Sequence, residues 1–144
     1  MKRTQIIENI KVRAGKEMSD FNDRSEKRVY FTIKKEILPK ITRYLFNDVK
    51  ARFVIASGVD TRKAIEILYH FSIDEIGLLV SLRVVLDKKD LQVESLTSIM
   101  KAANWIEREI HEYFGIDFKG HPNLKHLLLK DDWPEGCYPL RRDQ

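Results

Sequence analysis

A strict alternation of apolar residues runs through the middle of the chain. From Ile76 to Leu86 every even position is apolar, whereas the odd positions include Gly77, Ser81 and Arg83. Successive side chains of a β-strand point to opposite faces of its sheet, so this pattern predicts a long strand with one buried and one more exposed face. A register slip by one residue would turn the whole apolar set toward solvent. We therefore predict that the even-numbered side chains from 76 to 86 face a layer of helices.

Shorter strand-like segments lie on both sides of this alternation. We predict strands at residues 29–33, at 52–57 with an end at Gly58, at 65–71 and at 91–95. The connections at residues 72–75 and 87–90 are short and polar. Short connections join antiparallel neighbours, so we predict that residues 64–95 form consecutive antiparallel strands.

Apolar residues at helical spacing predict three helices. They are residues 4–14, a row from Ile37 to Val49 with Pro39 in its first turn, and residues 98–113 with Thr97 or Ser98 as the cap. The buried stripe predicted for the last helix is Ile99, Ala103, Ile106, Ile110 and Tyr113. Gly115 is well placed to end that helix. Residues 16–28 are polar, which predicts a mobile connection. Residues 116–144 predict an irregular tail that lies against another surface.

Composition limits the class of protein. The chain has 144 residues, 43% of them hydrophobic, which predicts a single domain over residues 1–144. Its net charge of +4 comes from 26 basic and 22 acidic residues that are mixed along the chain, so we expect no nucleic-acid partner. No apolar run approaches the ~20 residues of a membrane span, and we expect neither a signal peptide nor direct membrane insertion. The single cysteine, Cys137, cannot form an internal disulfide, which suits a reducing compartment.

The charged residues in the last predicted helix are of types that are common in active sites, but their spacing argues against a shared catalytic site. Glu107, Arg108 and Glu109 are consecutive, so they point about 100° apart on a helix and cannot converge on one atom. Glu107 with His111, and Arg108 with Glu112, have the i, i+4 spacing of surface ion pairs. We therefore predict a solvated face for Glu107 and Glu112.

Glu109 lies on another side of the same helix. It shares this side with Ala102 and Trp105, next to the buried stripe. For Arg108 and Glu109 three roles remain open: part of an interface, part of a buried pair, or part of a solvated face.

The histidines and the cysteine form no recognisable metal or catalytic pattern. His121 and His126 are five positions apart, and the sequence has no His-x-x-x-His pair and no cysteine cluster. No Ser-His-Asp arrangement can be argued, and Cys137 as a nucleophile has no support. His70 is predicted to be an ordinary histidine on the sheet surface. We expect no metal and no cofactor, and we assign no catalytic residue.

Two segments of the second half of the chain carry a specific motif. Residues 105–124 read Trp-Ile-Glu-Arg-Glu-Ile-His-Glu-Tyr-Phe-Gly-Ile-Asp-Phe-Lys-Gly-His-Pro-Asn-Leu, and residues 139–143 read Pro-Leu-Arg-Arg-Asp. Together they resemble the signature of the 30 kDa subunit of respiratory complex I, the NADH:quinone oxidoreductase. The resemblance covers about residues 28–143 and leaves residues 1–27 as an N-terminal helix and mobile connection. The same module occurs in energy-converting nickel–iron hydrogenases and formate hydrogenlyases.

This resemblance implies an α+β fold, a two-layer domain with a largely antiparallel or mixed sheet packed against helices and an irregular C-terminal tail. The strands and flanking helices predicted from the residue pattern agree with it. The resemblance also implies a non-catalytic assembly subunit, without a redox cofactor, of a membrane-associated multi-subunit oxidoreductase. The expected partners are the large hydrogenase-like subunit and the small iron–sulfur subunit. The expected location is peripheral, on the cytoplasmic side of the membrane.

The residues that match the family motif are assigned structural and docking roles and not catalysis. They are Glu107, Arg108, Glu109, Gly115, Phe118, Gly120, His121, Pro122, Pro139, Leu140, Arg141 and Asp143. We expect the segment from His121 to Asp143 to be the main docking element. We expect Arg141 to anchor it, because arginine can form a forked pair with a partner carboxylate.

The sequence also bears on the branch of the family and leaves alternatives open. Cys137-Tyr138 stands where complex I relatives usually have Gly-His before Pro-Leu-Arg, which favours the hydrogenase branch. Asn123 replaces the Asp that often follows Gly-His-Pro, so an acidic role at that position is in doubt. One alternative is a small independent enzyme that uses His121 or Cys137, and it requires turnover by the isolated chain. Another is a basic nucleic-acid-binding domain, and it requires binding with a steep salt dependence.

Overall fold

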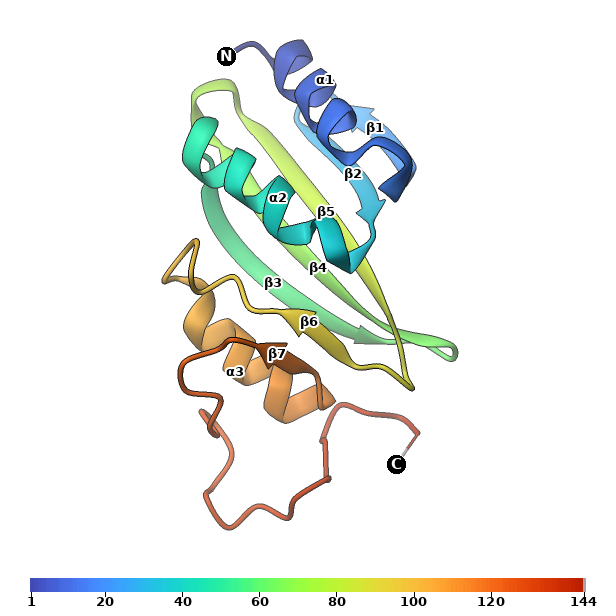
Figure 1. Ribbon diagram of the computed structural model, residues 1–144, viewed down its shortest axis with the longest axis vertical. Coiled ribbons are helices and arrows are strands. Elements are labelled where there is room, and N and C mark those ends of the chain that lie inside the picture. The colour runs from blue at the N-terminus through green and yellow to red at the C-terminus, as the bar shows by residue number, and fades with distance from the viewer. Residues whose placement is uncertain (144) are drawn as a thin grey trace.

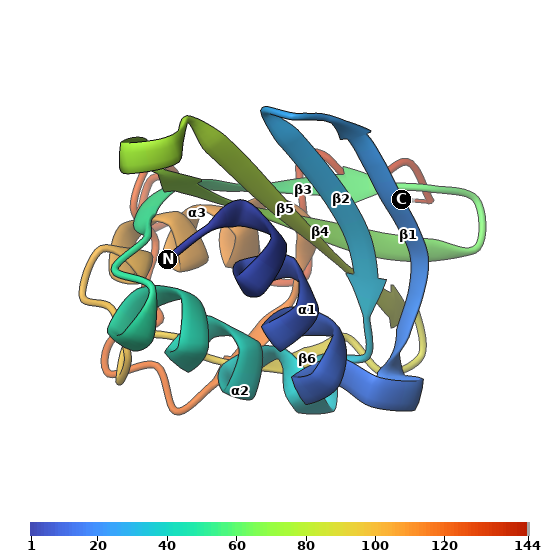
Figure 2. The ribbon, with the colours of Figure 1, turned by 90° about the horizontal axis from the view of Figure 1, so that it is seen from above.

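The computed structural model describes residues 1–143, which form two sheets and a layer of helices (Figure 1). Its main elements are α1 (Arg3–Ala14), β1 (Met18–Ser25), β2 (Arg28–Ile33), α2 (Leu38–Arg43), β3 (Arg52–Asp60), β4 (Ala64–Ile73), β5 (Leu78–Asp87), β6 (Gln92–Glu94), α3 (Ala103–Phe114) and β7 (Asp117–Lys119). A five-stranded sheet has the order β1-β2-β5-β4-β3, and β6 pairs with β7 in a second sheet. Figure 2 shows α1 and α2 on one side of the larger sheet. The predicted fold class, α+β with a mixed sheet packed against helices, is confirmed.

β5 is the central strand and carries the apolar alternation. Its even-numbered side chains from Leu78 to Leu86 are all buried in the core, as predicted. The prediction is wrong for Ile76, which lies in the short turn before the strand and is 37% exposed. On the opposite face Ser81 is also buried, because it lies between the larger side chains of Tyr30 and His70 on the neighbouring strands.

The segment predicted to be a mobile connection is instead an ordered edge strand. β1 pairs antiparallel with β2, from Met18 opposite Ile33 to Ser25 opposite Arg28. Most of its side chains are exposed, although Met18 and Phe21 pack against the core. Backbone pairing with a neighbouring strand needs no apolar alternation. The polar sequence of this segment therefore gave no pattern from which the strand could be predicted.

The prediction of consecutive antiparallel strands holds for only part of residues 64–95. β4 and β5 pair antiparallel, from Ala64 opposite Asp87 to Ile73 opposite Leu78. β5 pairs in parallel with β2 on its other side, so neither of its edges is free for the next strand. β6 therefore leaves the sheet and pairs in parallel with β7.

β3 continues past its predicted end at Gly58. The strand runs to Asp60, and Gly58 pairs with Ile67 of β4. The glycine is required by close packing and not by a turn. A Cβ atom at Gly58 would lie 2.5 Å from the ring of Phe114, so only a residue without a side chain lets the end of α3 approach the sheet.

The first two predicted helices are confirmed. α1 buries Ile6, Ile7 and Ile10 against the core, and α2 has Pro39 in its first turn, where a missing N–H costs nothing. A π-helical turn over Tyr44–Asp48 continues α2. Among residues 1–143, no helix is both long enough and apolar enough to span a membrane.

The third helix is shorter at its start than predicted. It begins at Ala103, whereas residues 96–102 form isolated hydrogen-bonded turns. Neither Thr97 nor Ser98 caps it, and the Thr97 hydroxyl lies instead 2.8 Å from that of Ser95. Gly115 ends the helix with a φ of +79°, as predicted.

Candidate docking site around α3

α3 carries the family-like motif and meets different surroundings on three faces. Its core face consists of Ala103, Glu107, Ile110 and Phe114. A second face, with Arg108, His111 and Glu112, contacts the segment that follows the helix. A third face, with Trp105, Ile106 and Glu109, lines a groove beside β3, together with Ala102 just before the helix. Consecutive charged residues thus reach three separate environments, in agreement with the prediction that they do not converge.

Glu107 is buried in the core face, so the prediction of a solvated side chain is wrong. The residue is 1% exposed, and its carboxylate accepts hydrogen bonds from Ser95 Oγ at 2.6 Å and from the Leu96 N–H at 3.2 Å. Burial raises the pKa of Glu107 to about 7, although these hydrogen bonds oppose the rise. The sequence held a signal of this burial, because Glu107 stands four positions after Ala103 and three before Ile110, within the apolar row.

Glu112 is buried as well, and the predicted surface pair with Arg108 does not form. Its carboxylate accepts the backbone N–H groups of Leu127 at 2.9 Å, Leu128 at 2.8 Å and Leu129 at 3.3 Å. One side chain of α3 therefore accepts hydrogen bonds from three N–H groups of an irregular segment. A contact of this kind could not be read from the sequence, because an irregular segment has no periodicity that shows which groups turn toward the helix.

Arg108 holds the same segment by its carbonyl groups. Its guanidinium donates to the carbonyl oxygens of Lys125 at 3.0 Å and His126 at 2.7 Å. Arg108 and Glu112 thus bind opposite kinds of backbone group in neighbouring residues, and we call this pair the tail clamp. Together they fix residues 125–129 without any regular secondary structure.

The histidines near α3 bind backbone groups of the chain. His111 Nδ1 lies 2.7 Å from the Ile116 carbonyl oxygen, and His126 Nδ1 lies 3.0 Å from that of Lys130. His111, His126 and Cys137 line a cavity of about 530 Å³ between α3 and the tail. In the described part of the chain, no group of three or more His, Cys, Asp or Glu side chains is arranged to hold a metal ion.

The groove on the third face is apolar and open to solvent. Trp105 is 70% exposed and Leu128 is 60% exposed, and Val54 and Ile55 of β3 are also exposed. The groove has a volume of about 430 Å³. Its other lining residues are Phe53, Ala102, Ile106, Glu109 and Leu127. Glu109 lies in this groove with Ala102 and Trp105, so the predicted side of the helix is confirmed.

The end of the tail is tied to the domain by polar contacts. Arg141 pairs with Asp143, with Nε donating to Oδ1 at 2.8 Å, and its Nη1 donates to the Phe114 carbonyl at 3.2 Å. The Arg142 N–H donates to Asp60 at 2.6 Å, and Lys88 lies 2.7 Å from the other Asp60 oxygen. The bond from Lys88, with that from Arg142, lowers the pKa of Asp60. The forked pair expected between Arg141 and a partner carboxylate is thus made within the chain.

Other motif residues set the course of the backbone. Phe118 of β7 is buried, and Gly120 follows this strand with a φ of +83°. The N–H of Leu140 donates to the Tyr113 carbonyl at 3.1 Å, but its side chain is exposed. Pro122 and Pro139 are exposed as well.

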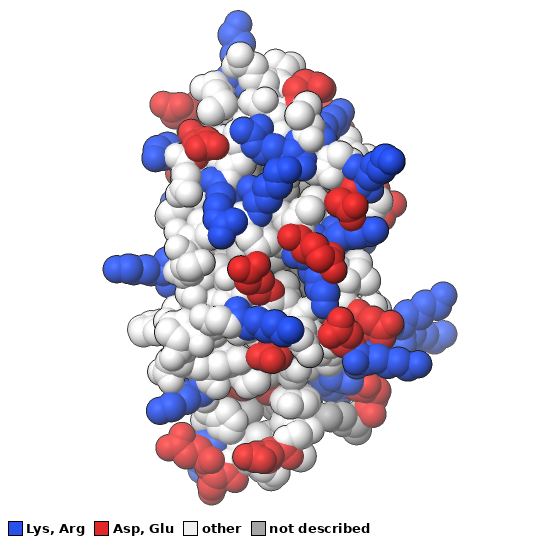
Figure 3. Space-filling model, viewed as in Figure 1, with Lys and Arg blue, Asp and Glu red and all other residues white. Residues whose placement is uncertain are grey.

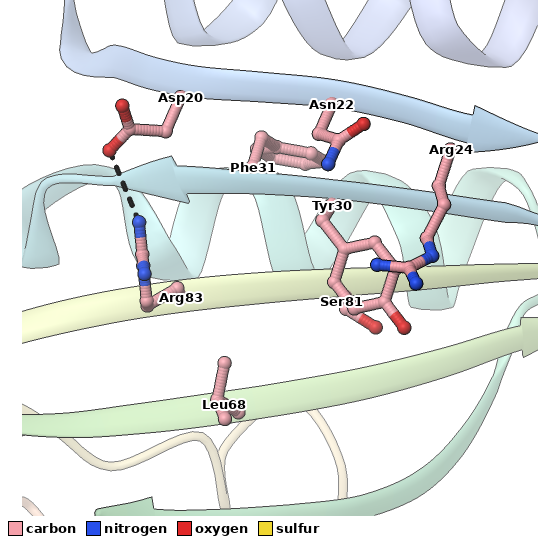
Figure 4. A pocket seen from close by; sticks show the side chains of 8 residues that line it. All are labelled: Asp20, Asn22, Arg24, Tyr30, Phe31, Leu68, Ser81 and Arg83. Carbon is pink, nitrogen blue, oxygen red and sulfur yellow. Dashed lines mark hydrogen bonds and ion pairs between the residues drawn. The ribbon is translucent and has the colours of Figure 1, made fainter.

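A further hollow lies on the larger sheet and is lined by residues of β1, β2, β4 and β5 (Figure 4). One of its two arginines, Arg83, pairs with Asp20 at 3.1 Å and Glu66 at 3.5 Å and donates to the Thr32 hydroxyl at 2.9 Å. Arg83 is thus already surrounded by partners within the chain, and no large apolar side chain among the described residues that line the hollow is exposed, so the hollow is a weaker candidate than the groove beside α3.

Comparison with known proteins agrees with the motif. Residues 31–144 match the family described as "Respiratory-chain NADH dehydrogenase, 30 Kd subunit". The chain is 34% identical over 121 residues to a subunit of the NADH-quinone oxidoreductase of Citrifermentans bemidjiense, in an alignment that covers 80% of this chain and 73% of that protein. It is 33% identical over 141 residues to a subunit of the F(420)H(2) dehydrogenase of Methanosarcina mazei, in an alignment that covers 96% of this chain and 89% of that protein.

A solved structure shares the fold. One polypeptide of the membrane-bound sulfane sulfur reductase, an archaeal respiratory membrane complex, aligns with a TM-score of 0.80 and 23% identity. The alignment covers 99% of this chain and 85% of that one.

Proposed function

Because this chain belongs to the family of respiratory-chain NADH dehydrogenase 30 kDa subunits, we propose that it is a non-catalytic assembly subunit of a membrane-associated multi-subunit oxidoreductase. The complex is of the complex I type or the energy-converting hydrogenase type. The chain docks onto the large hydrogenase-like subunit, beside the small iron–sulfur subunit, and is held peripherally on the cytoplasmic side. Two relatives are subunits of NADH-quinone oxidoreductase and F(420)H(2) dehydrogenase by name, which supports the subunit role.

The observation that carries this proposal is the way in which the charged motif residues are used. Glu107, Arg108 and Glu112 all bind backbone groups of their own chain. An active site gathers titratable groups around one reacting centre, whereas these residues diverge and shape the surface around α3. This arrangement suits a protein whose role is to present a binding surface to other subunits.

The motif residues divide into two roles under this proposal. Those that shape the chain are Glu107, Arg108, Gly115, Phe118, Gly120, His121, Arg141 and Asp143. Those available to partners are Glu109, Pro122, Pro139 and Leu140, with side chains in the groove or in exposed parts of the tail. The docking surface therefore combines the tail with the adjoining face of α3.

The structure favours this role over an independent enzyme. Both ring nitrogens of His121 bind backbone groups, since Nε2 lies 3.0 Å from the Asn104 carbonyl oxygen and Nδ1 accepts the Asn123 N–H at 3.0 Å. Such a histidine is held in one orientation by its own chain and is not free for proton transfer.

The surface charge disfavours the nucleic-acid alternative. Figure 3 shows acidic side chains among the basic ones on the face that carries α1 and α2. A nucleic-acid-binding surface is typically a continuous basic patch or stripe.

Purification of the tagged chain from its native cells tests the proposal. We expect the large hydrogenase-like subunit and the iron–sulfur subunit to accompany the chain in fixed ratio through two columns. Recovery of the chain alone, with turnover or with salt-sensitive binding to nucleic acid, would overturn the proposal.

Deletion of residues 134–144 tests the role of the tail. Most of the removed residues are exposed, and the tail clamp on residues 125–129 is retained. We expect a folded protein that no longer accompanies the large subunit. Normal assembly of the shortened chain, or its unfolding, would show that this part of the tail is not the docking element.

A further inference from the structure

We infer that the groove between β3 and the start of α3 receives an apolar segment of a partner subunit, and that this segment brings a lysine or arginine to Glu109. The inference rests on the proposed function, because it requires that the chain has partner subunits. It goes further by assigning one contact surface and the chemistry of the segment that covers it.

The groove exposes large apolar side chains that come from three separate parts of the chain. Trp105 of α3, Val54 and Ile55 of β3, and Leu128 of the tail all line it, and each is exposed. Contiguous apolar surface of this kind marks an interaction site, whereas single exposed apolar residues are ordinary. Tryptophan in particular is enriched among residues that dominate binding energy.

The tail clamp holds one wall of this groove in place. Glu112 accepts the N–H groups of Leu127, Leu128 and Leu129, so the backbone of these residues is fixed against α3 while the Leu128 side chain stays in solvent. The apolar wall is therefore rigid before any partner arrives. A preformed surface loses less conformational entropy when it binds.

Among the described residues that line the groove, Glu109 is the single charged one. Glu107, Arg108 and Glu112 are engaged within the chain, but Glu109 has no hydrogen bond or ion pair within residues 1–143. A carboxylate that is covered by an apolar segment needs a partner, since a buried unpaired charge is costly. Charge complementarity therefore calls for a lysine or arginine on the segment that covers it.

The same features argue against other occupants. Val54 is an extra residue in β3, between Phe53 opposite Phe71 and Ile55 opposite His70, and such a bulge interrupts the edge where a strand could be added. A second copy that docked by the same groove would bring two Glu109 carboxylates together. An anionic lipid surface would repel Glu109.

Substitutions in the complete complex test the inference. Cells that produce all subunits would carry tagged Trp105→Ala, Leu128→Ala or Glu109→Lys, and the amount of each partner subunit recovered with the chain would be measured. We expect recovery to fall about tenfold or more. Matched controls are Val12→Ala on α1 and Glu36→Lys before α2, which alter exposed side chains outside the groove and should recover partners as the wild type does. Since the groove side chains are exposed, all variants should melt as the wild type does.

A photoreactive amino acid at position 105 identifies the occupant. We expect a crosslink to a peptide of another subunit that is apolar and contains a lysine or arginine, and reversal of that charge should restore recovery by Glu109→Lys. A crosslink to a second copy of this chain would overturn the inference, and so would groove-dependent binding to phosphatidylglycerol vesicles. If the wild type recovers its partners and the three groove variants do so equally well, the groove inference fails while the proposed function stands. If the wild type recovers no partner, the proposed function itself fails.

Discussion

The ring of Tyr138 occupies the space that a side chain at Gly115 would need. A Cβ atom at Gly115 would lie 2.5 Å from Tyr138 Cε2, and Gly115 also has a φ of +79°. The glycine therefore meets two demands at once, the end of α3 and the return of the tail to the helix. The contact holds the residue just before the second motif segment, residues 139–143, against the first, residues 105–124.

Gly115→Ala should destabilise the protein more than Gly120→Ala. Both glycines have positive φ, which costs an alanine roughly 1 kcal/mol, but only Gly115 has a ring against it. We expect a further loss of about 1–3 kcal/mol for Gly115→Ala from the forced shift of Tyr138. Urea denaturation of both variants measures the difference. Equal losses would mean that the Tyr138 contact does not form in solution.

Glu112→Ala should loosen the tail, whereas Glu109→Ala should not. Loss of Glu112 leaves three N–H groups without their acceptor, and we expect a loss of about 2–3 kcal/mol in unfolding free energy. Limited proteolysis should then cut near residues 125–130 in the Glu112 variant first. Glu109 has no partner within the described chain and serves as the control on the same helix. Equal protease resistance in both variants would contradict the tail clamp.

The stability of the protein should fall as pH rises from about 4.5 to 7, because of Glu107. The pKa of Glu107 is about 7 in the folded protein, against 4.5 as its ordinary value, so in this range the unfolded chain ionises the group while the folded protein keeps it protonated. Ionisation therefore favours the unfolded state, and the effect is complete above pH 7.

Glu107→Gln tests this dependence. Glutamine retains an acceptor for Ser95 and Leu96 but does not ionise. Relative to the wild type, its unfolding free energy should rise by about 2–3 kcal/mol between about pH 5 and pH 8. Denaturant titrations at several pH values provide the measurement, with Glu109→Gln as the control that should follow the wild type. Parallel profiles for Glu107→Gln and the wild type would refute the buried carboxylate.

The two faces of β5 should respond differently to a charge. Val80→Asp places a carboxylate in the core and should cost about 4 kcal/mol or more, whereas Val85→Asp, at a position 47% exposed, should change stability by less than about 1 kcal/mol. Ser81→Asp should also be damaging, because Ser81 is buried beside His70. Thermal melting separates these cases. Similar losses at positions 80 and 85 would contradict the register of the strand.

The local pattern was sufficient to show which side of an element is buried. The alternation from Leu78 to Leu86 and the spacing along α1 each report a side that is buried in the structure. Helical geometry also separates Glu107, Arg108 and Glu109 without any knowledge of their neighbours.

Partnerships between distant segments were not visible in the same way. β6 was expected to extend the hairpins, but β2 already occupies the other edge of β5, and a strand order of this kind has no local signature. The burial of Glu112 depends on backbone groups of an irregular segment. The edge strand β1 is polar because only its backbone is needed for pairing.

The parallel pairing of β2 with β5 constrains the order in which the sheet assembles. β3, β4 and β5 follow one another with short turns, whereas Val29 must find Val80 across the whole intervening meander. Closing a long loop costs conformational entropy before the contacts that offset this cost can form. We therefore expect β3, β4 and β5 to fold first and the hairpin of β1 and β2 to join later. Amide hydrogens of β4 and β5 should then gain protection early in pulsed exchange during refolding, and those of β1 late. In the native state the same hairpin is the part that should detach as a unit while the rest of the sheet stays intact.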